Sequence, residues 1–243
     1  MNLAELAEHS ARRRGERMVL DFEGERFTNL QFLDWARRLQ RGFSNLGLMR
    51  GEIAVLYMAN HPLTYPVFQG IFRTGALAIP VMFMIAAPEL RYVLSDSGAQ
   101  GVVTDQANVA KVREAAQGLD HIRWIVVQGG DEHPEASPPE YRLETFLSNE
   151  PQKSLPQINE DDVALMLYTA GTTGKPKGVM LTHANLFASA EAANEAAELD
   201  QWEGSYIGMR VVLAASATED DAGRLCRIGH WLDTKSSGNM FTR

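Results

Sequence analysis

The sequence lacks the features that would set it apart from ordinary globular proteins. It has one cysteine, Cys226, in 243 residues, so no disulfide can form within the chain, which agrees with a reducing compartment. The longest apolar run, residues 76–87, contains a proline and is too short to cross a bilayer. The arginines at positions 12–14 are followed by no apolar core of an export signal. We therefore expect a cytoplasmic protein without a transmembrane segment.

Several functional classes are disfavoured by the same kind of absence. The formal net charge of −8 argues against a nucleic-acid partner, which favours a basic face. The six histidines are scattered without the paired spacing of metal ligands. The chain contains no Walker A loop, no Gly-x-Gly-x-x-Gly fingerprint and no Gly-x-Ser-x-Gly elbow. We therefore predict no metal-ligating residue and no hydrolase nucleophile.

Apolar runs alternate with helical patterns along the first half of the chain. Thr28 and Gln31 have the spacing of a capping box, and the helix that they begin carries one apolar stripe. Beyond it, we predict strands over residues 53–58, 76–81, 101–104 and 122–127, and helices over 62–73, 88–94 and 107–116. Strands separated by helices imply parallel pairing. The prediction is an α/β fold with a mainly parallel sheet flanked by helices on both faces.

Two shorter regions depart from this alternation. A helix over residues 1–15 and a hairpin that turns at Glu23 and Gly24 come first. Residues 129–157 are rich in proline, acidic residues and serine, which predicts a surface connection with one short helix near residues 141–147.

The most informative segment lies between two predicted strands, residues 163–167 and 179–181. Residues 168–178 have the sequence Tyr-Thr-Ala-Gly-Thr-Thr-Gly-Lys-Pro-Lys-Gly. Glycines allow backbone N–H groups to approach an anion, while hydroxyl and ammonium groups add donors and charge. The candidate phosphate-binding residues are Thr169, Ala170, Gly171, Thr172, Thr173, Gly174, Lys177 and Gly178.

This segment resembles the phosphate-binding motif of the adenylate-forming superfamily, whose usual form is Thr-Ser-Gly-Thr-Thr-Gly-x-Pro-Lys-Gly. The chain has Ala170 at the serine position, which removes one hydroxyl donor. Residues 21–28, 75–81 and 94–99 also resemble segments of acyl-CoA synthetases, so the resemblance covers roughly residues 15–205. These upstream segments support the family and the fold, and the loop carries the chemistry.

The resemblance implies an acid–CoA ligase that uses ATP with Mg²⁺ and coenzyme A, with fatty acids as the favoured acid. A carboxylate would attack the α-phosphorus of ATP, and the thiol of coenzyme A would then displace AMP from the acyl-AMP. In such a loop the threonines would supply hydroxyls, Gly171 and Gly174 would supply N–H groups, and Lys177 would supply charge. Lys175 lies at the variable position and is expected at the surface.

The resemblance stops near residue 209. The family's Pro-Leu-x-His-x-x-Gly segment, its magnesium-associated glutamate and its catalytic lysine are not found in these residues. We therefore divide the chain into residues 1–208, part of an AMP-binding domain, and residues 209–243, a divergent tail. A shifted reading frame and a natural short form both explain such a tail.

Three functions stay open on this basis. The first is an acid–CoA ligase whose machinery is incomplete in these 243 residues, so that they are inactive alone and no catalytic residue is assigned. The second is a non-catalytic nucleotide- or protein-binding remnant, and the third is a fragment of a peptide-synthetase adenylation domain. Uncovered sheet edges and apolar faces also predict self-association.

A helix follows the loop and its second strand. Thr182 is a suitable N-cap, and the helix is predicted to reach about residue 198. A histidine directly after an N-cap usually stays at the surface, and we expect this of His183.

Overall fold

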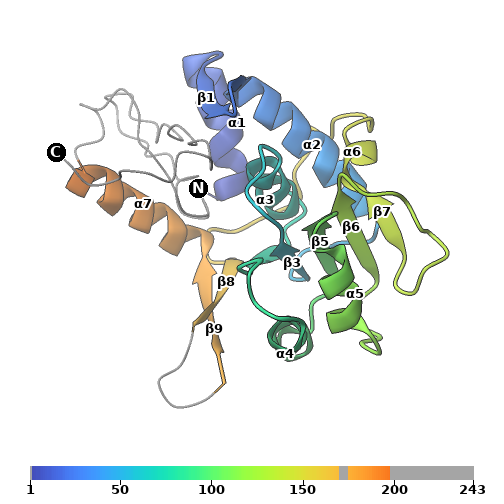
Figure 1. Cartoon of the computed structure of the whole chain (residues 1–243). Helices are drawn as coiled ribbons and strands as arrows, with labels where there is room; N and C mark the ends of the chain where they lie inside the picture. Colours follow the sequence, from blue (N-terminus) through green and yellow to red (C-terminus); the bar gives the residue numbers. More distant parts are fainter. Residues whose placement is uncertain (1, 170–174, 198–243) are drawn as a thin grey trace, which may run out of the picture.

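The fold is known from a computed structural model, which describes residues 2–169 and 175–197. In these residues a two-stranded hairpin precedes a seven-stranded sheet with the order β7-β6-β5-β3-β4-β8-β9 (Figure 1). The hairpin consists of β1 (Met18–Phe22) and β2 (Glu25–Thr28). The sheet strands are β3 (Ile53–Tyr57), β4 (Leu77–Pro80), β5 (Gly101–Asp105), β6 (Trp124–Gln128), β7 (Glu140–Arg142), β8 (Val163–Thr169) and β9 (Lys177–Thr182).

All neighbouring strands from β7 to β8 pair in parallel, whereas β9 runs antiparallel to β8. The predicted α/β class with a mainly parallel sheet is therefore confirmed. The single antiparallel pair follows from the short loop between β8 and β9, because a parallel return would need a much longer crossover.

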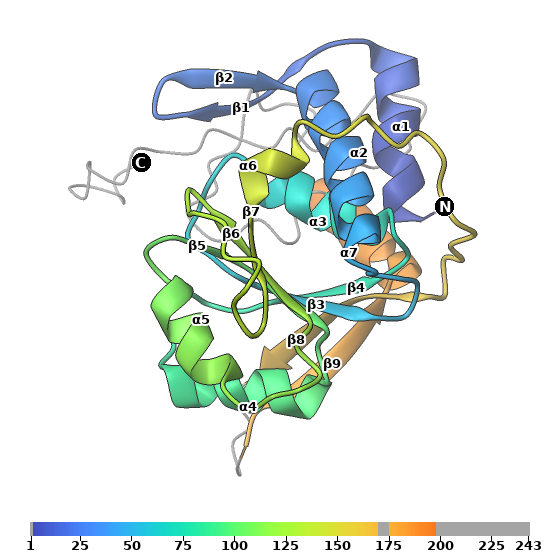
Figure 2. The same cartoon turned by 90° about the vertical axis from the view of Figure 1, so that its right-hand side faces the viewer.

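Helices cover both faces of the sheet, as the crossover rule predicts (Figure 2). One face carries α4 (Ala87–Ser97) and α5 (Val109–Ala116). The other carries α1 (Leu3–Arg14), α2 (Asn29–Asn45), α3 (Thr64–Phe72), α6 (Leu143–Phe146) and α7 (His183–Ala197).

The alternation of side chains along the strands builds two separate cores. In β3, Ala54 and Leu56 belong to the core beneath α2 and α3, and Val55 and Tyr57 belong to the core beneath α4 and α5. All four are fully or almost fully buried. A central strand of a parallel sheet is covered on both faces, which explains its continuous apolar sequence.

The predicted capping box at the start of α2 is confirmed. The Thr28 hydroxyl oxygen accepts a hydrogen bond from the Gln31 N–H at 3.2 Å, and the Gln31 side chain accepts one from the Thr28 N–H at 2.8 Å. At the other end of the fold, α4 has a proline in its first turn and ends at Gly98 with a φ of 64°. That left-handed conformation suits glycine and stops the helix.

A buried charged network joins the three helices α1, α2 and α3. The side chain of Arg73 is completely buried; it pairs with Glu8 at 3.0 Å, and its Nε donates to Gln40 at 2.9 Å. Glu8 also pairs with Arg37. Burial lowers the pKa of Arg73, and the Glu8 carboxylate opposes that shift. Removing Glu8 would leave the buried Arg73 guanidinium without its carboxylate, so the network holds α1 against α2 and α3.

The connection over residues 129–157 contains more structure than its composition predicts. The short helix near residues 141–147 is present as α6, but the three residues Glu140–Arg142 add a parallel strand, β7, to the edge of the sheet. His133 and Glu140 also form an isolated antiparallel bridge. A strand of three residues has no readable periodicity, so composition alone could not reveal it.

Candidate functional site

The candidate phosphate loop connects β8 to β9 at one edge of the sheet. Of its predicted residues, the structure places Thr169, Lys177 and Gly178. The other five candidates, Ala170, Gly171, Thr172, Thr173 and Gly174, lie outside the described residues. The location of the loop between two strands agrees with the sequence, and its contacts with a ligand stay a prediction.

Thr169 and Lys177 are directly opposite each other at the end of the hairpin. Opposed residues of an antiparallel pair project from the same face of the sheet, with Cβ atoms about 5 Å apart. This face is the one on which Leu167 and Leu181 pack toward the core of α2 and α3. Both Thr169 and Lys177 are exposed. The hairpin thus places a hydroxyl and an ammonium group together, a pair that can bind an anion.

Gly178 has a packing reason that is independent of any ligand. It is opposite Tyr168, and a Cβ atom at this position would lie 2.6 Å from the Met166 sulfur and 3.3 Å from Tyr168 Cζ. Real Cβ atoms do not approach a neighbour that closely. A glycine therefore lets the aromatic ring and the thioether cover this strand, and a larger residue would force the flexible Met166 side chain to move.

Side chains of α4 contact both ends of the loop, which the sequence did not indicate. The Tyr168 hydroxyl donates to Asp96 at 2.7 Å, and the Tyr92 hydroxyl donates to the Pro176 carbonyl at 3.0 Å. Lys175, expected at the surface, is exposed, and its Nζ lies 5.4 Å from the centre of the Tyr92 ring. Burial and the hydrogen bond to Asp96 raise the pKa of Tyr168 well above its ordinary value, so this phenol is a donor at neutral pH.

The expectation that His183 lies at the surface is wrong. It is 1% exposed and forms an edge-on ring contact with Phe72, and its Nδ1 accepts a hydrogen bond of 3.3 Å from the Leu3 N–H. Burial lowers its pKa to about 4, although Asp162 favours the charged form. Thr182 does cap α7, with its hydroxyl accepting from the Asn185 N–H at 3.1 Å. His183 therefore packs the start of α7 against α1 and α3.

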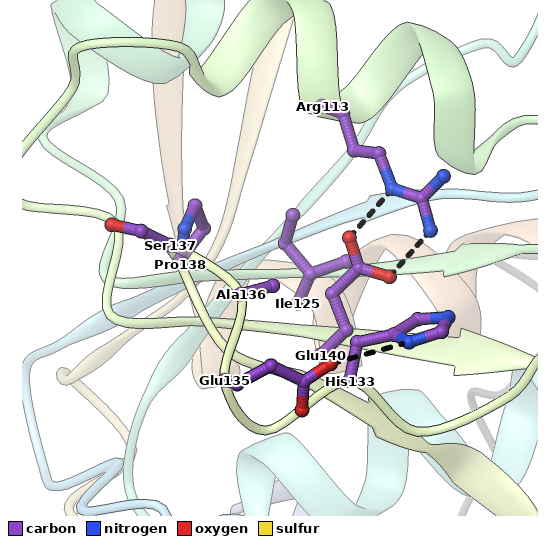
Figure 3. Close-up of a pocket in the computed structure, with 8 residues that line it drawn as sticks. All are labelled: Arg113, Ile125, His133, Glu135, Ala136, Ser137, Pro138 and Glu140. Atoms are coloured by element: carbon purple, nitrogen blue, oxygen red, sulfur yellow. Dashed lines mark hydrogen bonds and ion pairs between the residues drawn. The ribbon is translucent and has the colours of Figure 1, made fainter.

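A hollow of about 480 Å³ lies at the opposite edge of the sheet (Figure 3). The Arg113 guanidinium is turned to Glu140 in this hollow, with two hydrogen bonds of 2.6 and 2.7 Å. The other ionisable side chains that line it are those of His133 and Glu135, whose Nδ1 and Oε1 atoms lie 3.7 Å apart. The one guanidinium is already paired with a carboxylate, so this hollow offers little charge to an anionic ligand.

Neither a metal cluster nor a membrane span is found in the part of the chain that the structure describes. Residues 2–169 and 175–197 contain no group of three histidine, cysteine, aspartate or glutamate side chains placed to hold a metal ion. In the same ranges no helix combines the length and apolar character needed to cross a bilayer.

The curated relatives carry the names of CoA ligases and of a CoA synthase. The chain is 28% identical over 195 residues to a medium/long-chain-fatty-acid–CoA/3-oxocholest-4-en-26-oate–CoA ligase of Mycobacterium tuberculosis, covering 77% of this chain and 34% of the relative. It is 31% identical over 162 residues to a feruloyl-CoA synthase of an Amycolatopsis species, covering 65% and 29%. The chain thus spans about a third of the length of these curated relatives.

Solved structures agree on the fold. An anthranilate CoA ligase in complex with anthranoyl-AMP superposes with a TM-score of 0.72 at 22% identity, and a benzoate CoA ligase from Burkholderia xenovorans with 0.67 at 23%. Each match covers 79% of this chain and 36% of the other. The sequence profile described as AMP-binding enzyme matches residues 7–221. The chain therefore belongs to the AMP-binding enzyme family, and the relatives that it resembles are acyl-CoA ligases.

Proposed function

We propose that this chain supplies the phosphate-binding part of an ATP-dependent acid–CoA ligase, with fatty acids as the substrate class. A carboxylate oxygen attacks the α-phosphorus of ATP, and the bond to pyrophosphate breaks, which gives acyl-AMP. The sulfur of coenzyme A then attacks the acyl carbon, loses its proton and releases AMP. The names of the curated relatives, which include fatty-acid ligases, support this reaction class.

The observation that carries the proposal is the pairing of Thr169 with Lys177 at the loop end of the β8–β9 hairpin. The first step brings an anion to a polyphosphate, so neutralisation of charge and positioning dominate the barrier. Lys177 makes no ion pair with any other residue among those that the structure describes. Its charge is therefore available to a phosphate, whereas Lys175 contacts an aromatic ring.

Magnesium is expected to accompany ATP, but no residue is assigned to it. The described residues do not fit such an ion, because they contain no cluster of three carboxylate or imidazole ligands. We further propose that residues 1–208 carry the family's domain, that residues 209–243 form a divergent tail, and that the protein is cytoplasmic, as its single cysteine supports.

Calorimetry with ATP tests the role of the loop. We expect weak binding by the 243-residue polypeptide and about a tenfold loss in Lys177→Ala, because one charged phosphate contact disappears. Lys153→Ala is the matched control, since it removes an exposed lysine from the connection before β8. Binding in the low micromolar range that neither Lys177→Ala nor Gly174→Val weakens would contradict the proposal and indicate another site.

Pyrophosphate release separates a ligase from a non-catalytic nucleotide-binding remnant. With ATP, magnesium, coenzyme A and fatty acids of increasing length, we expect no turnover from these 243 residues alone. They lack the Pro-Leu-x-His-x-x-Gly segment of the resembling enzymes. Turnover that Lys177→Ala abolishes would refute this expectation. Binding of a partner protein without any ATP binding would instead favour the remnant.

A further inference from the structure

Two polar side chains on one face of α4 are directed at the β8–β9 hairpin. Tyr92 and Asp96 are four residues apart in α4, so they lie one turn above each other on the same side of the helix. Their partners are Tyr168, which directly precedes the candidate phosphate-binding residues, and Pro176, which directly precedes Lys177. One helix face thus contacts both ends of the loop across a distance of more than 70 residues in sequence.

The first end is held by a hydrogen bond to a carboxylate. Tyr168 is the last residue but one of β8, and its hydroxyl donates to Asp96 Oδ2 at 2.7 Å. Hydrogen bonds to an ionised acceptor are shorter and stronger than neutral ones. Gly178, opposite Tyr168, leaves space for the aromatic ring to reach α4.

The second end is held through the backbone. The Tyr92 oxygen lies 3.0 Å from the Pro176 carbonyl oxygen and 3.4 Å from Asp96 Oδ1. A phenol has one proton to donate, and the shorter distance assigns it to Pro176, the residue before β9. Lys175, the preceding residue, contributes a cation–π contact of 5.4 Å with the Tyr92 ring.

These contacts are not needed to hold α4 on the sheet. The helix is anchored by Ala87, Leu90, Val93 and Leu94, all of which are buried, whereas Tyr92 is half-buried and Asp96 is exposed. The polar pair therefore acts on the hairpin rather than on its own helix. Fixing both ends of a loop lowers the conformational entropy that the loop loses when it binds a ligand.

We infer that Tyr92 and Asp96 of α4 are positioning residues: through Tyr168 and Pro176 they hold the two flanks of the phosphate-binding segment, without touching the phosphates. This inference rests on the proposed function of the loop and extends it to a helix outside the motif. It also divides the two lysines: Lys175 belongs to the α4 contact, and Lys177 projects from the other face of the sheet, beside Thr169.

Hydrogen exchange of the segment 168–178 tests the positioning without any nucleotide. We expect Asp96→Ala and Tyr92→Phe to speed exchange there about tenfold, since local opening becomes easier, while the melting temperature stays within a degree or two. Asp120→Asn, a surface carboxylate beyond α5, and Tyr141→Phe in β7 are the matched controls and should change nothing. Unchanged exchange in both test variants would overturn the inference.

A double-mutant cycle on ATP affinity tests the consequence for binding. Asp96→Ala and Tyr168→Phe should each weaken binding about fivefold, and the double variant no further, because both remove one bond. Asp96→Asn keeps an acceptor and should restore most of the affinity, a rescue that lost packing would not give. Additive losses, or a failure of Asn to rescue, would count against the inference.

The two proposals fail in different ways. If the wild-type polypeptide binds neither ATP nor pyrophosphate but exchange responds to Asp96→Ala, the proposed function fails and the positioning stands. If ATP binds, Lys177→Ala weakens it and Asp96→Ala does not, the proposed function stands and the positioning falls.

Discussion

The two edges of the seven-stranded sheet differ in how their charged and polar groups are used. At the β7 edge, Arg113 is paired with Glu140 through two hydrogen bonds, and the acid is almost fully buried. At the β9 edge, Lys177 is exposed beside Thr169, and α4 holds the hairpin from one side. A cation that already neutralises a protein carboxylate has little attraction for a phosphate. The comparison therefore favours a structural role for the first edge and supports the proposal that ligand binding belongs to the second.

The largest expected effect is on the pH dependence of stability, through the buried His183 at the start of α7, which follows β9. His183 has a pKa of about 4 in the folded protein against about 6.5 when unfolded. Between these values the unfolded chain binds more protons, so stability is complete above pH 6.5 and falls by about 3 kcal/mol toward pH 4. Chemical denaturation from pH 4.5 to 7.5 measures this slope.

His183→Asn is the control for this slope, because it keeps an acceptor for the Leu3 N–H and does not titrate. The hydrogen bond from Arg50 lowers the pKa of Asp162. The stabilisation that this carboxylate contributes is therefore also lost in acid, both in the wild type and in His183→Asn. The difference between the two slopes isolates His183. Identical slopes between pH 5 and 6.5 would show that the histidine is not buried in solution.

The β7 edge should respond asymmetrically to loss of its ion pair. Arg113→Ala leaves a buried carboxylate without its cation and should lower the free energy of unfolding by about 2 kcal/mol. Glu140→Gln leaves an arginine that is half exposed to water, and it should have a smaller effect. Urea denaturation measures both. ATP affinity should stay unchanged in each, and a loss of affinity would contradict the division between the two edges.

At the β9 edge, Gly178→Ala should destabilise the protein by about 1 kcal/mol, because the new methyl group meets Met166 and Tyr168. The same substitution in a Met166→Ala background should have less effect, since the nearest atoms are gone. Urea denaturation of the four proteins gives the comparison. An equal effect in both backgrounds would show that the methionine is not the obstacle.

The smallest expected effect is on self-association, which we propose occurs through β9. In residues 2–169 and 175–197, β9 is the outermost strand of the sheet, and its Val179 and Met180 are exposed. Apolar edge strands tend to associate. Met180→Lys should weaken self-association about fivefold in sedimentation experiments. Met82→Lys is a matched control, because both methionines are 62% exposed and Met82 is not part of the sheet edge. Equal effects would place the contact elsewhere.

The sequence predicted the features that depend on local patterns. The buried strand β5, the capping box at Thr28 and the position of the loop between two strands all follow from short-range periodicity and turn chemistry. His183 was misjudged because its burial depends on Phe72 and Leu3, which are distant in sequence. The contacts of α4 were missed for the same reason, since the spacing of Tyr92 and Asp96 does not name their partner.

Because β8 pairs with β9, an odd or an even change in the length of β9 decides on which face of the sheet Lys177 lies. Side chains alternate between the two faces, so adding one residue within β9, with the pairs near Leu181 retained, would move Lys177 to the face that carries Met166 and Tyr168. Adding two residues would return Lys177 to the face of the sheet that carries Thr169. The loop sequence would be identical in both variants. Only the two-residue insertion would keep the Lys177 ammonium group on its present face. A comparison of such hairpins by motif alone would therefore overlook on which face of the sheet the lysine lies, which the number of residues in the strand reveals.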